Sequence, residues 1–84
     1  MPAPKSVKLA NRASKAIAAA DPPLKEILKE AIREIASDPL IGKALKGPLQ
    51  GLRSYRVGKY RLTYSFTENS LAVASIEHRK DAYR

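Results

Sequence analysis

Two arginines of a predicted β-hairpin carry the clearest chemical signal in the sequence. Residues Leu52–Val57 and Tyr60–Thr67 alternate as strands do, and Gly58-Lys59 between them suits a two-residue type II′ turn. This turn places Arg56 directly opposite Arg61. Like charges in that position repel, whereas two guanidinium groups together bind a phosphodiester and stabilise charge that develops on it. The pair favours a phosphate-binding site; the alternative is two side chains that splay into water or pair with carboxylates.

The register of the hairpin also sorts its side chains onto two faces. One face is apolar and is expected to cover the core, through Tyr55, Val57, Tyr60, Leu62, Tyr64 and Phe66. The other face is polar and holds Ser54, Arg56, Arg61, Thr63 and Ser65. We therefore expect the arginine pair on a face of the sheet that no helix covers.

The end of the chain adds cationic, titratable and aromatic groups, in the order Glu77-His78-Arg79-Lys80-Asp81-Ala82-Tyr83-Arg84. An arginine and a tyrosine beside a basic groove can hold a phosphate and stack on a base. His78 either transfers protons near neutral pH or is a surface histidine beside Glu77. Tyr83 either stacks on a base or closes the end of the core.

The charge of the chain indicates a polyanionic partner. Sixteen Lys and Arg against eight Asp and Glu give a formal net charge of +8 in 84 residues, and the isoelectric point is near 10.1. Such a balance favours binding to nucleic acid, to an anionic membrane surface or to an acidic protein, the alternative being a merely soluble basic domain.

The composition disfavours several other classes of function. The chain has no cysteine, which removes disulfides and thiolate metal ligands and fits a reducing cytoplasm. His78 is the one histidine and the carboxylates lack metal-ligand spacing, so we expect no metal or cofactor. The start of the chain has no apolar segment typical of a secretion signal, and no stretch approaches the roughly 18 apolar residues of a membrane span.

A short strand and two helices precede the hairpin. Ser6–Leu9 is expected to be the strand, Asn11 the N-cap of a helix that reaches about Ala20, and Asp21-Pro22-Pro23 the start of a second helix that ends at Ser37-Asp38-Pro39. One side of the first helix is apolar, through Ala13, Ala16, Ile17 and Ala20. The second helix has one apolar stripe, formed by Leu24, Ile27, Leu28, Ala31, Ile32, Ile35 and Ala36.

Residues 40–51 are predicted to form a basic connector that carries Lys43 and Lys46. Leu71–Ile76 is predicted to form a last strand after the hairpin. The chain is therefore expected to form one α+β domain over residues 1–84. A short N-terminal strand is followed by a two-helix hairpin and a three-stranded antiparallel meander, with both helices on one face of the sheet.

The segment Leu45–Arg84 resembles the C-terminal half of toxins of the RelE/ParE superfamily, which belong to type II toxin–antitoxin systems. The resemblance is strongest over Gly51–Tyr64, with its Arg-Val-Gly-Lys-Tyr-Arg-Leu-Thr-Tyr, and over His78–Arg84. The helix pair that ends in Ser-Asp-Pro matches the N-terminal half of the family more loosely. This resemblance implies the same βααβββ order as the periodicity.

RelE-like members of this family cut mRNA in the ribosomal A site without a metal: the ribose 2′-OH attacks the adjacent phosphate and leaves a 2′,3′-cyclic phosphate. By position, the resemblance implies that Arg61 stabilises the phosphate in the transition state and that Arg56 orients it or assists proton transfer. It implies that Arg79 contacts the phosphate or the leaving group, that Tyr83 stacks on a base, and that His78 is an acid or base. Other cations expected to contact RNA are Lys46, Arg53, Lys59, Lys80 and Arg84.

One position departs from the family pattern. RelE-like toxins usually have a second basic residue two positions before Arg56 on the same strand face, where this chain has Ser54. Serine cannot supply the charge, so weaker activity is expected. Arg53 and Lys59 are near in sequence, but alternation points Arg53 to the other face.

Three functions remain open at this level. The first is a ribosome-dependent mRNA endoribonuclease, which the basic residues and Tyr83 favour. The second is a ParE-like inhibitor of DNA gyrase, and the third is a catalytically weak homologue that only binds its antitoxin. Both toxin functions imply an acidic antitoxin that covers the basic face, and operator DNA bound through that antitoxin.

Overall fold

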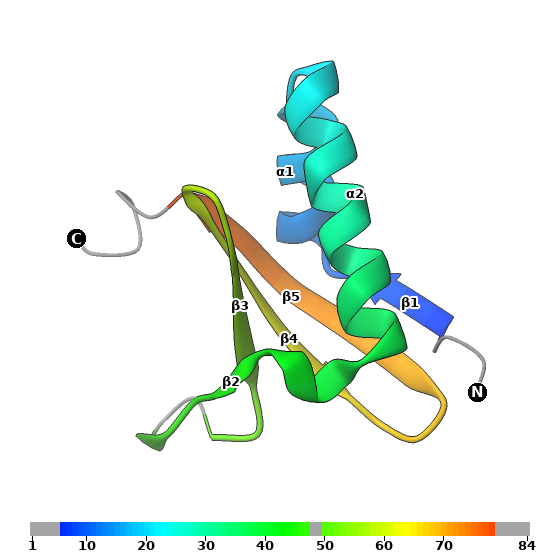
Figure 1. Ribbon diagram of the computed structural model, residues 1–84, viewed down its shortest axis with the longest axis vertical. Helices are drawn as coiled ribbons and strands as arrows, with labels where there is room; N and C mark the ends of the chain where they lie inside the picture. The colour runs from blue at the N-terminus through cyan, green and yellow to red at the C-terminus, as the bar shows by residue number, and fades with distance from the viewer. Residues whose placement is uncertain (1–5, 48–49, 79–84) are drawn as a thin grey trace.

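The computed structural model describes residues 6–47 and 50–78, which form an α+β fold as predicted (Figure 1). Two helices follow a short strand, and an antiparallel sheet follows the helices. The elements in chain order are β1 (Ser6–Leu9), α1 (Asn11–Ala19), α2 (Pro22–Ser37), the 3-10 helix η1 (Pro39–Ile41), β2 (Lys43–Ala44), β3 (Arg53–Val57), β4 (Tyr60–Phe66) and β5 (Ser70–His78).

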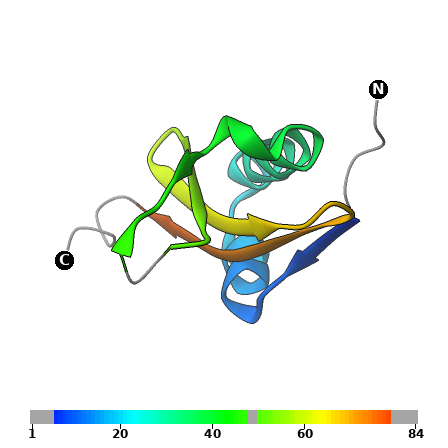
Figure 2. The same ribbon diagram turned by 90° about the horizontal axis from the view of Figure 1, so that it is seen from below.

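The sheet has five strands in the order β1-β5-β4-β3-β2. As expected, the N-terminal strand joins the sheet, where it pairs with β5 in parallel, and the other neighbouring pairs are antiparallel. Side chains of both helices and of one face of β4 and β5 form a single hydrophobic core. Figure 2 shows how strongly the sheet twists beneath the two helices, which stand nearly end-on in that view.

The prediction that Asn11 caps the first helix is wrong. Ala10 occupies the N-cap position, and no side chain caps this helix. The pairing of β1 with β5 extends one residue beyond the strand, because the Ala10 N–H donates to the Val73 carbonyl at 3.0 Å. Ala10 is thereby held in an extended conformation, and its own carbonyl accepts the first helical hydrogen bond, from the N–H of Ser14.

The second helix begins and ends where the prolines predict. Asp21 is its N-cap residue, with an extended backbone and no hydrogen bond from its side chain, and Pro22 and Pro23 fill the first turn. The apolar stripe faces the core except at Ile27, which is 51% exposed. At 100° per residue Ile27 lies about 90° from the centre of the stripe, at the border between core and solvent. Among the described residues, no helix is long and apolar enough to cross a membrane.

The observed strand boundaries differ by one or two residues from those predicted from the sequence, and one strand, β2, was not predicted. Residues 43–44 pair with β3 as β2, inside the segment read as a connector. A β-bulge shifts the register between β4 and β5, since Thr63 pairs with Ser75 whereas Tyr64 pairs with Val73. The bulge lets both halves of β5 present apolar residues to the helices.

One residue expected in the core is partly exposed. Phe66 is 37% exposed at the last position of β4. The turn that follows it lies beyond the C-terminal end of α2 (Figure 1), so the helices no longer cover the sheet there. Closer to the centre of the sheet, Leu62 and Tyr64 are fully buried as the alternation predicts.

Candidate active site on the open face of the sheet

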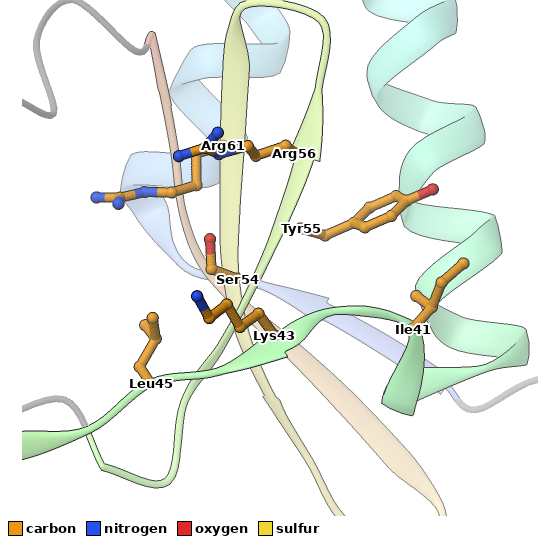
Figure 3. Close-up of a pocket in the computed structure, with 7 residues that line it drawn as sticks. All are labelled: Ile41, Lys43, Leu45, Ser54, Tyr55, Arg56 and Arg61. Atoms are coloured by element: carbon orange, nitrogen blue, oxygen red, sulfur yellow. The ribbon is translucent and has the colours of Figure 1, made fainter.

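The arginine pair forms as the two-residue turn predicts. Arg56 pairs with Arg61 across β3 and β4, and Arg61 in turn pairs with Glu77 on β5. Paired residues project to the same face of a sheet, so these three side chains form one row on the face opposite the helices. Figure 3 shows both arginine side chains extending away from α2, while Tyr55 points towards it.

A second row runs parallel to the first. Ser54 pairs with Thr63, which pairs with Ser75, and on the outer side Ser54 pairs with Lys43 of β2. This row is made of small hydroxyl side chains with a lysine at its edge. Its neighbour two residues along each strand is the charged row, so Lys43 and the arginine pair border the same part of the surface.

An open groove lies where the two rows meet the edge of β3. It encloses about 590 Å³ and is lined by Ile41, Lys43, Leu45, Ser54, Tyr55, Arg56 and Arg61 (Figure 3). Three of these side chains are cations, and none of the described residues that line the groove carries a carboxylate. The lining therefore suits an anionic ligand with an apolar or aromatic portion.

Arg61 is less exposed than Arg56, its partner in the pair. The residue is partly buried, and its Nε is buried with no hydrogen-bond partner. Glu77 does not neutralise it directly, because its carboxylate accepts a hydrogen bond from the Ser75 hydroxyl at 3.1 Å and forms no salt bridge with Arg61 within the described chain. A buried donor without a partner is costly, and an anion bound beside Arg61 would satisfy it.

His78 lies apart from this groove. It pairs with Tyr60 at the end of β5, and the two rings meet edge to face with centroids 5.1 Å apart. Strand alternation puts His78 on the opposite face from its neighbour Glu77 and from Arg61. A direct acid or base role for His78 at the arginine pair is therefore not supported by its position in the fold.

Arg53 makes structural contacts with the backbone. Its guanidinium donates to the carbonyl oxygens of Leu40, at 3.1 Å, and of Gly42. This contact lies on the helix side of the sheet, as alternation predicted. Arg53 thus fixes the segment that leads into β2.

Tyr64 also holds the segment that leads into β2 in place. Its buried hydroxyl donates to the Pro39 carbonyl at 2.6 Å and accepts from the Gly42 N–H at 3.1 Å. Glycine is required at position 42, because a Cβ there would lie 2.9 Å from the Ser54 carbonyl oxygen and would collide with the Tyr64 hydroxyl. Together these contacts set the position of β2 beside β3.

The other residues expected to bind RNA are placed as follows. Lys59 is exposed in the turn between β3 and β4, and Lys46 is exposed after β2. Four residues lie outside the described part of the chain: Arg79, Lys80, Tyr83 and Arg84. Within the described part, no three His, Cys, Asp or Glu side chains gather as metal ligands would.

Lys43 and Glu77 also belong to this surface, although the sequence pattern did not predict it. Lys43 stood in a segment read as a connector, and Glu77 followed the expected end of the last strand. A signal for Lys43 was present: Gly47 and Gly51 frame a short connection between two extended segments, which is typical of antiparallel neighbours. Glu77 follows from extending the last strand by two residues.

The fold and this open face define a small basic α+β protein whose sheet carries Lys43, Arg56 and Arg61 around one groove. Residues 7–84 match the family of ParE-like toxins of type II bacterial toxin–antitoxin systems. Toxin RelG of Mycobacterium tuberculosis is 33% identical over 64 residues, which cover 73% of this chain and 74% of RelG. The chain therefore belongs to the ParE-like toxin family, within the RelE/ParE superfamily.

Solved structures agree with this assignment. The RelBE2 toxin–antitoxin complex from Mycobacterium tuberculosis contains a chain that is 26% identical, with a TM-score of 0.82 over 92% of this chain and 100% of that one. The YoeB dimer from Staphylococcus aureus has the same fold at 22% identity, with a TM-score of 0.74 over 90% of this chain and 98% of that one.

Proposed function

We propose that this toxin is a single-domain, ribosome-dependent mRNA endoribonuclease that inhibits translation in the cytoplasm. The observation that carries the proposal is the Arg56–Arg61 pair, set across β3 and β4 on the face opposite α1 and α2. Two like charges paired across strands oppose folding. The Arg56–Arg61 pair therefore favours a site that binds an anion. The groove beside the pair adds Lys43, and the described residues of its lining include no carboxylate.

The chemistry follows from the substrate. In RNA the 2′-oxygen forms a bond to the neighbouring phosphorus and the bond to the 5′-oxygen breaks, which gives a 2′,3′-cyclic phosphate and a 5′-hydroxyl. The proton lost by the 2′-hydroxyl is balanced by the proton gained by the leaving oxygen.

Arg61 stabilises the charge on the phosphate in the transition state and Arg56 orients the phosphate. An arginine is a poor base at neutral pH, so these two side chains act mainly through charge. Arg79 and Tyr83 are proposed to contact the leaving group and to stack on a base.

The proposed partner is an acidic antitoxin. RelBE2 and the Staphylococcus aureus YoeB–YefM pair are both solved as toxin–antitoxin complexes. An acidic segment laid over the open face would neutralise part of the +8 charge and block the arginine pair. We propose that operator DNA is bound only through that antitoxin.

The test is a reconstituted translation system in which mRNA ends are mapped by primer extension. Wild-type protein is expected to cut within the A-site codon only when ribosomes are present. Arg61→Ala should cut about 100- to 1000-fold more slowly, because it removes one charge-stabilising donor. Lys29→Ala, which removes an exposed lysine from α2, is the control and should cut like the wild type. An intact message with the wild-type protein would contradict the proposal.

The family description favours one second candidate. The matching family is named for ParE, and a ParE-like chain would inhibit DNA gyrase without cutting RNA. Purified gyrase with supercoiled DNA distinguishes the two functions. Linear DNA that accumulates with this protein, together with intact mRNA in the translation assay, would favour the gyrase inhibitor.

A further inference from the structure

Ser54 breaks the usual pattern of basic residues on β3, but the structure places a lysine directly beside it. Lys43 on β2 pairs with Ser54 across the edge of the sheet. Both side chains line the groove that contains Arg56 and Arg61. In Figure 3 the amine of Lys43 points towards the Ser54 hydroxyl, on the same side of β3 as the two guanidinium groups.

The backbone at Lys43 is fixed on both sides. Before it, Gly42 donates its N–H to the Tyr64 hydroxyl and accepts a hydrogen bond from the Arg53 guanidinium. After it, the Leu45 N–H donates to the Leu52 carbonyl at 3.0 Å, which continues the pairing with β3. These contacts hold the backbone of Lys43 in place, so its exposed side chain stays at the rim of the groove.

The small side chain at position 54 suits this arrangement. A serine leaves the space above β3 open, so the long Lys43 chain can cross it towards the arginine pair. A basic residue at 54 would instead stand directly opposite Lys43 as a second like-charged cross-strand pair, which is unfavourable. A lysine at position 43 is therefore best accommodated by an uncharged residue at position 54.

We propose that Lys43 supplies, from β2, the phosphate-binding charge that β3 lacks at Ser54. This inference rests on the proposed endoribonuclease function and adds a third cation to its site. Lys43 contacts a phosphate of the bound RNA beside the one held by Arg56 and Arg61. The charge of the site is moved to the neighbouring strand rather than lost, so we expect full activity despite the serine.

The experiment compares four proteins in the ribosome-dependent cleavage assay: wild type, Lys43→Ala, Lys29→Ala and the double variant Lys43→Ala with Ser54→Lys. Lys43→Ala should cut about 10- to 100-fold more slowly, as expected for the loss of one charge-assisted contact. Lys29→Ala removes an exposed lysine of α2, outside the groove lining, and should cut within about threefold of wild type. The double variant returns the charge to β3 and should recover most of the rate.

Binding provides a second readout. The logarithm of the affinity for a non-cleavable mRNA on the ribosome should fall less steeply with the logarithm of salt concentration in Lys43→Ala, by a slope of about one. Thermal unfolding of each variant should match the wild type, because the side chain of Lys43 is exposed.

The outcomes separate the two proposals. Cleavage by wild type and Lys43→Ala at equal rates would overturn the inference and leave the endoribonuclease function standing. A slow Lys43→Ala that Ser54→Lys does not rescue would show that the charge must come from β2, and would overturn the equivalence of the two positions. No cleavage by the wild type would overturn the proposed function, and this inference with it.

Discussion

The two faces of the β3–β4 hairpin are made from alternate residues of the same strands, yet they differ in burial and in charge. On one face Leu62 and Tyr64 are fully buried against the helices. On the other face Arg56 stands opposite Arg61 and is exposed. The repulsion within this pair is tolerated because neighbouring residues on the opposite face supply the hydrophobic stabilisation. In this hairpin, the buried apolar side chains and the cationic side chains occupy alternate positions of each strand.

The largest expected effect comes from adjacent residues on opposite faces. Leu62→Ala should lower the free energy of unfolding by about 2–5 kcal/mol, because it leaves a cavity in the core. Arg61→Ala should lower that free energy by less than about 0.5 kcal/mol, because it also removes a like-charge contact with Arg56 and a buried donor without a partner. It should nevertheless remove most cleavage. Urea unfolding monitored by circular dichroism measures both. A loss of stability for Arg61→Ala as large as that for Leu62→Ala would refute the division between the faces.

Tyr64 is the point where the buried face controls the open one. Tyr64→Phe removes the hydrogen bonds to Pro39 and Gly42 and should cost about 1–3 kcal/mol, because the freed backbone groups are part-buried or buried. Since these contacts set the position of β2, cleavage should fall as well. Tyr60→Phe, four residues earlier on the same strand, is the matched control. Unchanged cleavage in a destabilised Tyr64→Phe would show that β2 does not depend on this anchor.

Much of the fold could be predicted from local chemistry. The prolines after Asp21 and Asp38 set the bounds of the second helix, and a two-residue turn fixed the register that puts Arg56 opposite Arg61. The bulge in β5 was also present in the sequence, because the apolar residues Leu71, Val73 and Ile76 break the period of two. The N-cap of α1 was not predictable locally, since the pairing of Ala10 with β5 determines it.

The candidate site was predicted only in part, because its edge depends on contacts distant in sequence. A strand of two residues shows no alternation, so Lys43 could not be assigned to a face before its pairing with Ser54 was known. Alternation gave the face of Arg53 correctly but not its partners, which are carbonyls of the segment that leads into β2. His78 illustrates the same limit: its pairing with Tyr60 places it on the face opposite the arginine pair.

A smaller effect is expected on the helix-facing side, where Tyr55 joins β3 to α2. Its hydroxyl donates to the Glu34 carboxylate at 3.2 Å. Burial, and then the Glu34 carboxylate, raise the pKa of Tyr55 above its usual 10.0 in the folded state. The protonated form is favoured by folding, so this contribution to stability is complete below pH 10 and is lost as the pH rises beyond it.

Tyr55→Phe should therefore lower the free energy of unfolding by about 0.5–1.5 kcal/mol at neutral pH. Above the usual tyrosine pKa, its stability should decline less steeply with pH than that of the wild type. Chemical unfolding over a series of pH values measures both effects. Parallel declines would show that the Glu34 contact does not contribute.

The smallest expected effect concerns the balance of charge on the open face. Arg61 has the like charge of Arg56 on one side and the opposite charge of Glu77 on the other. Glu77→Gln removes that compensation while its amide oxygen still accepts from Ser75, so the free energy of unfolding should fall by about 0.2–1 kcal/mol at low salt. High salt should reduce the difference between Glu77→Gln and wild type, because partly exposed charges are screened.

Glu30→Gln breaks the exposed ion pair with Arg33 on α2 and is the control, with an effect below about 0.5 kcal/mol. If the loss in Glu77→Gln is the same at low and high salt, Glu77 acts through its hydrogen bond to Ser75, and the repulsion between the arginines is relieved by something other than its charge.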